Sequence, residues 1–222
     1  PAGSYDSLMA AIQAGADAVY FGAGKLNMRA RSSQNFTPED LENIASICRE
    51  NGVKSYLTLN TIVYDEEMDQ IRVMADTAKK AGISAIIASD ISVMEYAREI
   101  GMPVHVSTQC NITNLQAVRF YSRYAEVMVL ARELRLEQVA AISRGIREQS
   151  LTGPGGRPIR LEIFVHGALC MAVSGKCYLS LDTLNHSANR GSDVCSSDLS
   201  GKCYLSLDTL NHSVSGKCYL SL

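Results

Sequence analysis

The sequence predicts an α/β fold, a TIM-like (β/α) barrel, and two observations support this prediction. Short runs rich in β-branched residues alternate with stretches whose apolar residues recur every three or four positions, as in amphipathic helices. Glycines stand between a helical stretch and the next strand, where a left-handed residue commonly ends a helix: Gly15, Gly52, Gly82 and Gly101. Strands that alternate with helices indicate a parallel sheet with right-handed crossovers.

The chain begins with Pro1-Ala2-Gly3, followed by a predicted helix over 4–14. These first three residues are typical of a loop that follows a strand and leads into a helix. We therefore expect the first strand of the barrel to be missing. Thr37 and Pro38, followed by two acidic residues, predict a helix start. Six further strands are predicted, and adding the missing strand gives seven, close to the eight of a TIM barrel. A doubly wound sheet is the alternative. Such a sheet usually carries a glycine-rich phosphate loop after its first strand, and the Gly-Ala-Gly sequence at 22–24 is too short a signal for that loop. Six strands are predicted at 17–22, 54–61, 83–89, 104–109, 127–131 and 161–166.

Composition bounds the function only coarsely. The 222 residues include 21 basic and 23 acidic side chains, for a net charge of −2, so no overall basic surplus indicates a nucleic-acid binder. The sequence contains no run of about 18 apolar residues, so we expect no membrane span. Seven cysteines in a chain built like a cytosolic α/β enzyme indicate thiols or metal ligands rather than disulfides. We expect a cytoplasmic protein.

The carboxyl ends of barrel strands carry active groups. Leu57, Leu59, Val104 and Val106 are expected to face the helices, so alternate residues such as His105 and Glu162 point inward. The strand ends then gather polar side chains near one mouth, and we expect a polar pocket there, although barrel interiors also tolerate polar layers. These side chains are Asn60, Asp90, Gln109, Arg132, Glu133 and His166.

Two chemistries remain open at this mouth. His105, His166 and Glu162 could hold a metal, although no helical His-x-x-x-His pair is present. Cys170 could act as a nucleophile with His166 as its base, although no third group is evident to orient the histidine. Cys170 and Cys177 could instead ligate an iron-sulfur cluster, which usually requires four cysteines, or be structural thiols.

The segment 162–180, EIFVHGALCMAVSGKCYLS, carries a resemblance. Its pattern of Glu, Phe, Gly, Cys, Gly, Cys and Ser is similar to the signature of the U-thirty-two peptidase family, also called the collagenase-like protease family, and matches in register at ten positions: Glu162, Phe164, Gly167, Ala168, Leu169, Cys170, Gly175, Cys177, Leu179 and Ser180. Segments 1–22, 56–68 and 104–114 also resemble family segments. The resemblance implies a TIM-like barrel.

The resemblance also implies chemistry. Better-understood members of the family resemble oxygen-independent hydroxylation factors for tRNA, rRNA or the ubiquinone ring, with a 4Fe-4S cluster on four cysteines. Cys170 and Cys177 match the first two ligands; residues 187–191, SANRG, resemble the lead-in to further ligands in the RNA-acting branch, which this chain lacks. We therefore expect part of an iron-sulfur-dependent enzyme that hydroxylates tRNA or rRNA, inactive as a fragment. A peptidase of unassigned catalytic type and a non-catalytic binding barrel are the alternatives.

Three parts of the chain are expected: a partial barrel at 1–169, a cysteine-bearing segment at 170–191, and a non-native tail at 192–222. Residues 174–187 recur unchanged as 200–213, and 173–181 recur as 214–222, whereas natural repeats diverge. The connector at 192–199, SDVCSSDL, back-translates to the end of a sequencing adaptor. We expect the tail to pack poorly against the barrel. A metal-binding repeat through Cys177, Cys203 and Cys218 is the alternative.

Overall fold

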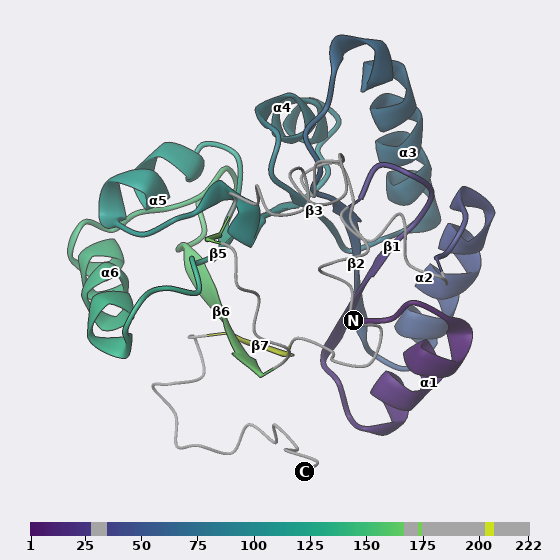
Figure 1. Cartoon of the computed structure of the whole chain (residues 1–222), viewed down its shortest axis with the longest axis horizontal. Helices are drawn as coiled ribbons and strands as arrows, with labels where there is room; N and C mark the ends of the chain where they lie inside the picture. Colours follow the sequence, from purple (N-terminus) through teal and green to yellow (C-terminus); the bar gives the residue numbers. More distant parts are fainter. Residues whose placement is uncertain (28–34, 167–172, 175–202, 207–222) are drawn as a thin grey trace.

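Six parallel strands follow one another in chain order and curve into a half-barrel in this computed structural model (Figure 1). The structure describes residues 1–27, 35–166, 173–174 and 203–206. All six predicted strands are present, several of them ending earlier than predicted. They are β1 (Ala18–Gly22), β2 (Lys54–Leu59), β3 (Ala85–Ala88), β4 (Val104–Val106), β5 (Val127–Val129) and β6 (Arg160–His166).

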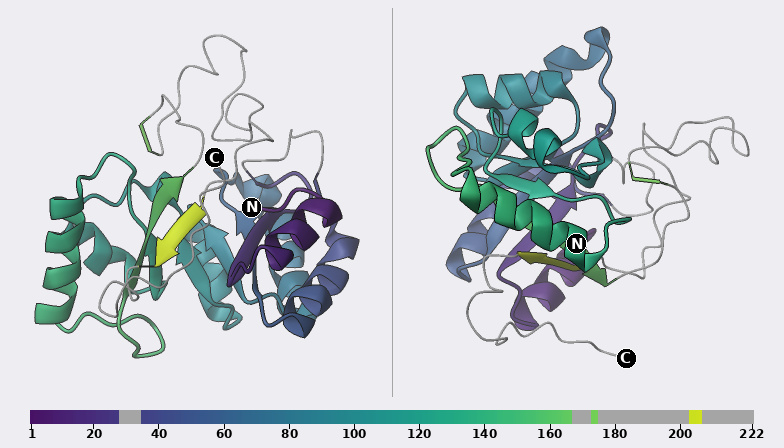
Figure 2. Two further views of the ribbon diagram at one scale, coloured as in Figure 1. Left: turned by 90° about the horizontal axis from the view of Figure 1, so that it is seen from below. Right: turned by 90° about the vertical axis from the view of Figure 1, so that its left-hand side faces the viewer.

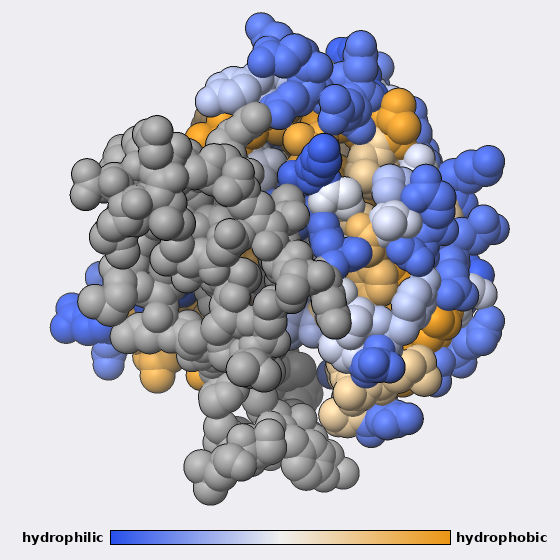
Figure 3. Space-filling view, turned by 45° about the vertical axis from the view of Figure 1, so that its right-hand side comes forward, coloured by the Kyte–Doolittle hydropathy of each residue, from blue (hydrophilic) through white to orange (hydrophobic). Residues whose placement is uncertain are grey.

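In the part of the chain that the structure describes, six α-helices cover the outer, convex side of this sheet (Figures 1 and 2). Over α1 to α3 the outer surface is mostly hydrophilic, as expected for helices whose other face packs on a sheet (Figure 3). The helices are α1 (Tyr5–Gln13), α2 (Leu41–Glu50), α3 (Met68–Ala81), α4 (Ile91–Glu99), α5 (Leu115–Tyr121) and α6 (Leu136–Glu148), and short 3-10 helices occupy Pro38–Asp40, Asp65–Glu67 and Thr108–Cys110.

The hydrophobic core lies between the strands and these helices. Phe21, Leu57, Ile86, Val106 and Met128, one from each of five neighbouring strands, are completely buried there. Each such side chain contributes roughly 1.5–3 kcal/mol through burial. Because successive strand residues point to opposite faces, this apolar face leaves the alternate residues on the concave side.

The ends of the helices follow the predicted signals. The Asp40 carboxylate accepts a hydrogen bond from the Thr37 N–H at 2.8 Å, which fixes the turn that leads into α2. Gly82 ends α3 with a φ of +84°, a conformation that costs other residues energy. The other three glycines predicted to end helices also have positive φ angles, between +68° and +81°.

The segment predicted to be non-native contributes one described element, β7 (Cys203–Ser206). It pairs antiparallel with β6, placing Glu162 opposite Ser206 (Figure 2). The side chains of β7 and the rest of 192–222 lie outside the described residues, so the poor packing, the non-native origin and the three-part division all stay predictions. Within the described part of the chain, no helix combines the length and apolarity needed to cross a membrane.

Candidate functional site

Three polar side chains meet on the concave face of the half-barrel. Tyr56 of β2, His105 of β4 and Glu162 of β6 alternate with core residues, so all three point away from the helices. The Tyr56 and His105 rings lie 4.4 Å apart between centroids. His105 Nδ1 lies 3.6 Å from Glu162 Oε1. The sequence-based prediction that His105 and Glu162 point inward is consistent with this contact.

Burial controls the protonation of this pair. The side chain of His105 is 7% exposed and that of Glu162 is 16% exposed, so each loses most of the solvation of its charged form. Burial lowers the pKa of His105 to about 3, with a smaller contribution from Arg160 and Lys54. Burial raises the pKa of Glu162 to about 7, against the opposing effect of the same two cations. Near neutral pH the imidazole is therefore neutral, and the carboxyl group is divided between its two protonation states.

This arrangement suits general acid–base chemistry. A carboxyl group that titrates near pH 7 exchanges protons readily at physiological pH, which is the property that such catalysis requires. Nδ1 of His105 is buried and makes no hydrogen bond within the described residues. The distance of 3.6 Å to Glu162 is longer than an ordinary hydrogen bond, so a small movement would bring the two groups into proton-transfer range.

Tyr56, Lys54 and Arg160 belong to this site and were not predicted from the sequence. Burial and the charge of Glu162 raise the pKa of Tyr56 to about 12, so its hydroxyl keeps its proton. Lys54 shares the inward parity of Tyr56 on β2, and Arg160 shares that of Glu162 on β6. The alternation of inward and outward residues along a strand, which indicated His105, could therefore also have identified Tyr56, Lys54 and Arg160 from the sequence.

The predicted mouth at the carboxyl ends of the strands forms only in part. Asp90 begins α4: its carboxylate accepts from the Ser92 N–H at 2.9 Å and from the Val63 N–H at 3.1 Å, which is a structural role. Gln109 does not lie on β4, because the strand ends at Val106 and Gln109 enters the following 3-10 helix. The prediction of a strand over 104–109 was therefore too long at its end, and the place of Gln109 at the mouth stays a prediction. Asn60 directly follows β2 and is half-buried.

Arg132 and Glu133, also predicted at the mouth, hold Ser174. The Ser174 N–H donates to Glu133 Oε1 at 2.8 Å, and the Arg132 N–H donates to Ser174 Oγ at 3.3 Å. Burial opposes the ionisation of Glu133, but the hydrogen bonds from Ser174 outweigh it and lower the pKa of that carboxyl. Ser174 is completely buried. The two residues just after β5 therefore anchor Ser174, which lies between Cys170 and Cys177 in the sequence.

The remaining predicted groups lie outside the described residues. They are the thiols of Cys170 and Cys177 and the side chain of His166, whose backbone ends β6. Within the described residues no three His, Cys, Asp or Glu side chains converge as metal ligands. Cys48 and Cys110 are free thiols, and burial raises the pKa of both, that of Cys110 to about 11. Neither therefore has the thiolate character of a nucleophile.

Comparisons with known proteins relate this chain to one family. The family model described as peptidase family U32 matches residues 3–198. A protein of Porphyromonas gingivalis named collagenase is 64% identical over 192 residues, which cover 86% of this chain and 46% of that protein. The 23S rRNA 5-hydroxycytidine C2501 synthase of Escherichia coli is 34% identical over 191 residues, which cover 83% of this chain and 27% of the synthase.

A solved structure shares the fold. The U32 peptidase Mk0906 superimposes with a TM-score of 0.60 and 15% sequence identity, over 77% of this chain and 68% of that one. This likeness supports the TIM-like curvature of the sheet. The chain spans about half the length of the collagenase that it matches.

The pKa of Glu162 predicts how its substitution changes stability with pH. The folded chain keeps a proton on Glu162 that the unfolded chain releases between about pH 4.5 and 7, so the wild type loses stability as pH rises through that window. Gln cannot titrate. Glu162→Gln is therefore expected to gain stability relative to the wild type over the same window, by about 1–3 kcal/mol in total.

Urea unfolding from about pH 4 to about pH 8 measures this difference. Glu99→Gln, at the exposed end of α4, is the matched control and should show no such trend. The opposite trend, in which Glu162→Gln becomes less stable relative to the wild type as pH rises, would mean that Glu162 is held ionised by His105.

Proposed function

Since this chain belongs to peptidase family U32, we propose that it is part of a polypeptide-cleaving enzyme in which Glu162 is the general acid–base. The observation that carries the proposal is the burial of Glu162 beside His105, which raises the pKa of the carboxyl to about 7. The relative named collagenase is 64% identical to this chain, and the rRNA-hydroxylating relative is 34% identical. This difference favours the peptidase alternative over the RNA hydroxylation that the sequence analysis put first.

Hydrolysis of a peptide bond requires one proton to leave the attacking water and another to reach the leaving nitrogen. In this proposal the ionised Glu162 accepts the proton from water and then, protonated, donates it to the departing amine, so that the carboxylate is regenerated. His105 stays neutral, and its burial beside Glu162 helps keep water from solvating the carboxyl. The Tyr56 hydroxyl, which retains its proton, is a donor available to a developing oxyanion.

A second function is favoured by the anchoring of Ser174. The hydrogen bonds of Arg132 and Glu133 hold Ser174, which lies between Cys170 and Cys177 in the sequence, and a cluster site would require such an anchor beside its ligands. These two cysteines would supply two of the four ligands of a 4Fe-4S cluster, which supplies one-electron chemistry when bound. The rRNA-hydroxylating relative supports this candidate, with rRNA or tRNA as substrate.

The peptidase proposal predicts a loss of turnover on Glu162→Gln. In the full-length protein, kcat for cleavage of labelled gelatin is expected to fall by about 10²- to 10⁴-fold, the usual contribution of a general acid–base. The wild-type kcat/KM should rise as pH increases through about 7, because the ionised carboxyl begins the reaction. Glu99→Gln is the control and should keep the wild-type rate and pH profile.

Two outcomes count against this proposal. If the wild-type protein cleaves neither gelatin nor collagen peptides, the proposed peptidase activity is ruled out. Cleavage that persists in Glu162→Gln with an unchanged pH profile leaves the activity but assigns it to other residues.

The cluster candidate predicts an effect of Arg132 and Glu133 on bound iron. Arg132→Ala removes the side-chain Nε–H that donates to Ser174 Oγ at 3.4 Å, and Glu133→Gln replaces the charged acceptor of the Ser174 N–H with a weaker, uncharged amide. Both variants loosen Ser174, so iron affinity of the anaerobically prepared full-length protein is expected to fall by about 10- to 100-fold, as for other residues that support metal ligands. Glu137→Gln, in the first turn of α6, is the matched control. Iron retained in full by the Cys170→Ser/Cys177→Ser double variant would exclude these cysteines as ligands.

A further inference from the structure

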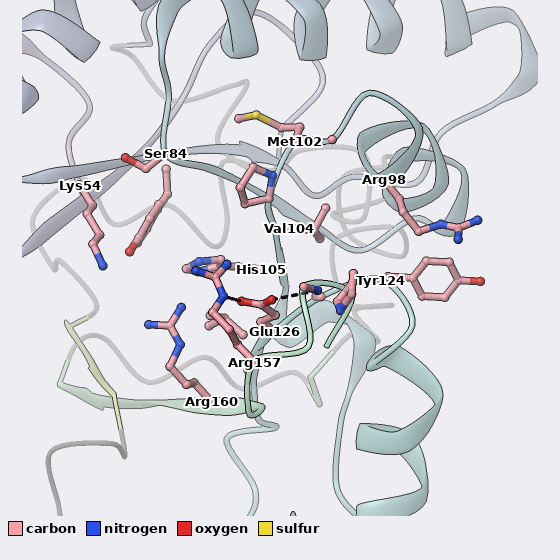
Figure 4. Close-up of a pocket in the computed structure, with 17 residues that line it drawn as sticks. Lys54, Ser84, Arg98, Met102, Val104, His105, Tyr124, Glu126, Arg157 and Arg160 are labelled. Atoms are coloured by element: carbon pink, nitrogen blue, oxygen red, sulfur yellow. Dashed lines mark hydrogen bonds and ion pairs between the residues drawn. The ribbon is translucent and has the colours of Figure 1, made fainter. Parts of the chain in front are cut away.

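A cavity of about 510 Å³ opens at the amino-terminal ends of the strands (Figure 4). Its walls come from the first residues of several strands or from the residues just before them. Lys54 and Val104 begin β2 and β4, Arg160 begins β6, and Glu126 directly precedes β5. The cavity therefore lies at the opposite end of the sheet from the loop that holds Ser174. Tyr56 and His105 of the concave face also line the cavity, so it adjoins the proposed peptidase site.

The lining of this cavity is strongly basic. Among the described residues it contains four basic side chains and one acidic side chain, a formal charge of +4 − 1 = +3: Lys54, Arg98, Arg157, Arg160 and Glu126. Glu126 is already occupied, because its Oε2 lies 2.6 Å from Arg157 Nε and its Oε1 accepts from the Gly155 N–H at 3.1 Å (Figure 4). Arg98 pairs with Glu95 at 2.8 Å, outside the cavity lining.

The positive potential extends inward to the concave face. After burial, the charges of Arg160 and Lys54 are the further causes that lower the pKa of both His105 and Glu162. A cation lowers the pKa of acids and bases alike, so this common direction indicates that Arg160 and Lys54 act on both groups beside the cavity. In Figure 4, Lys54, His105 and Arg160 lie on one side of the cavity, where an anion would meet all three.

We propose that this cavity binds a phosphate group carried by a small molecule. Arginine presents a rigid fork of N–H donors that matches phosphate oxygens, and lysine adds a point charge. Lys54 and Arg160 together carry two positive charges, which a doubly charged group matches better than a single carboxylate does. The volume lies within the range of small-molecule sites, and Met102, Pro103 and Val104 provide an apolar wall for the rest of the ligand.

Calorimetric titration of the full chain with inorganic phosphate tests this site directly. Saturable binding is expected, weakened about tenfold or more by Arg160→Gln and by Lys54→Gln, since each loses a charge-assisted contact. Arg72→Gln, which removes an exposed arginine that pairs with Asp69 on α3, is the matched control and should bind as the wild type does. Acetate should bind at least about tenfold more weakly than phosphate.

Three results would overturn the proposal. They are the absence of saturable phosphate binding, equal weakening by Arg72→Gln, and affinities of Arg160→Gln and Lys54→Gln equal to that of the wild type. Acetate binding as tight as phosphate would replace the phosphate group with a carboxylate. Circular dichroism confirms that each variant folds; if Arg160→Gln does not, Lys54→Gln at the exposed start of β2 decides the result. Because no activity is measured, this test is independent of the proposed peptidase.

Discussion

The desolvation of Glu162 and His105 on the concave face is the constraint on which the chemistry of this half-barrel depends. The sheet directs its apolar residues to the helices, so polar side chains of β2, β4 and β6 must share the inner face. Val127 and Val129 of the intervening β5 are small enough for His105 and Glu162 to approach across it. In that setting an imidazole and a carboxyl group are both more stable uncharged, which gives the carboxyl a pKa near 7.

The two ends of the same strands hold different groups around this pair. At the carboxyl ends, Arg132 and Glu133 hold Ser174 through hydrogen bonds. At the amino ends, Lys54 and Arg160 border a basic cavity and act on the protonation of the pair through their charge. The curved sheet thus brings the anchored Ser174, the Glu162–His105 pair and the cationic cavity into one part of the fold, although their residues come from distant parts of the sequence.

Much of the fold could be predicted from the sequence, because strand alternation and helix ends are local signals. The apolar positions Leu57 and Val106 identified the helix-facing side, and His105 and Glu162 then followed from a period of two. The strand over 104–109 was predicted too long because nothing local showed that β4 ends at Val106. Asp90 looked like a mouth residue, but its position before α4 makes it a helix cap. The protonation of Glu162 could not be predicted, since it depends on burial between strands distant in sequence.

Nuclear magnetic resonance titration measures the protonation of Glu162 and His105 separately. With selective ¹³C labelling of glutamate carboxyls and ¹⁵N labelling of histidine, each group reports its own protonation. We expect the Glu162 carboxyl to titrate at a pKa of about 7 and the His105 imidazole to stay neutral until strongly acidic pH. A Glu162 carboxyl already ionised below its ordinary pKa of 4.5, beside a His105 protonated at neutral pH, would contradict it.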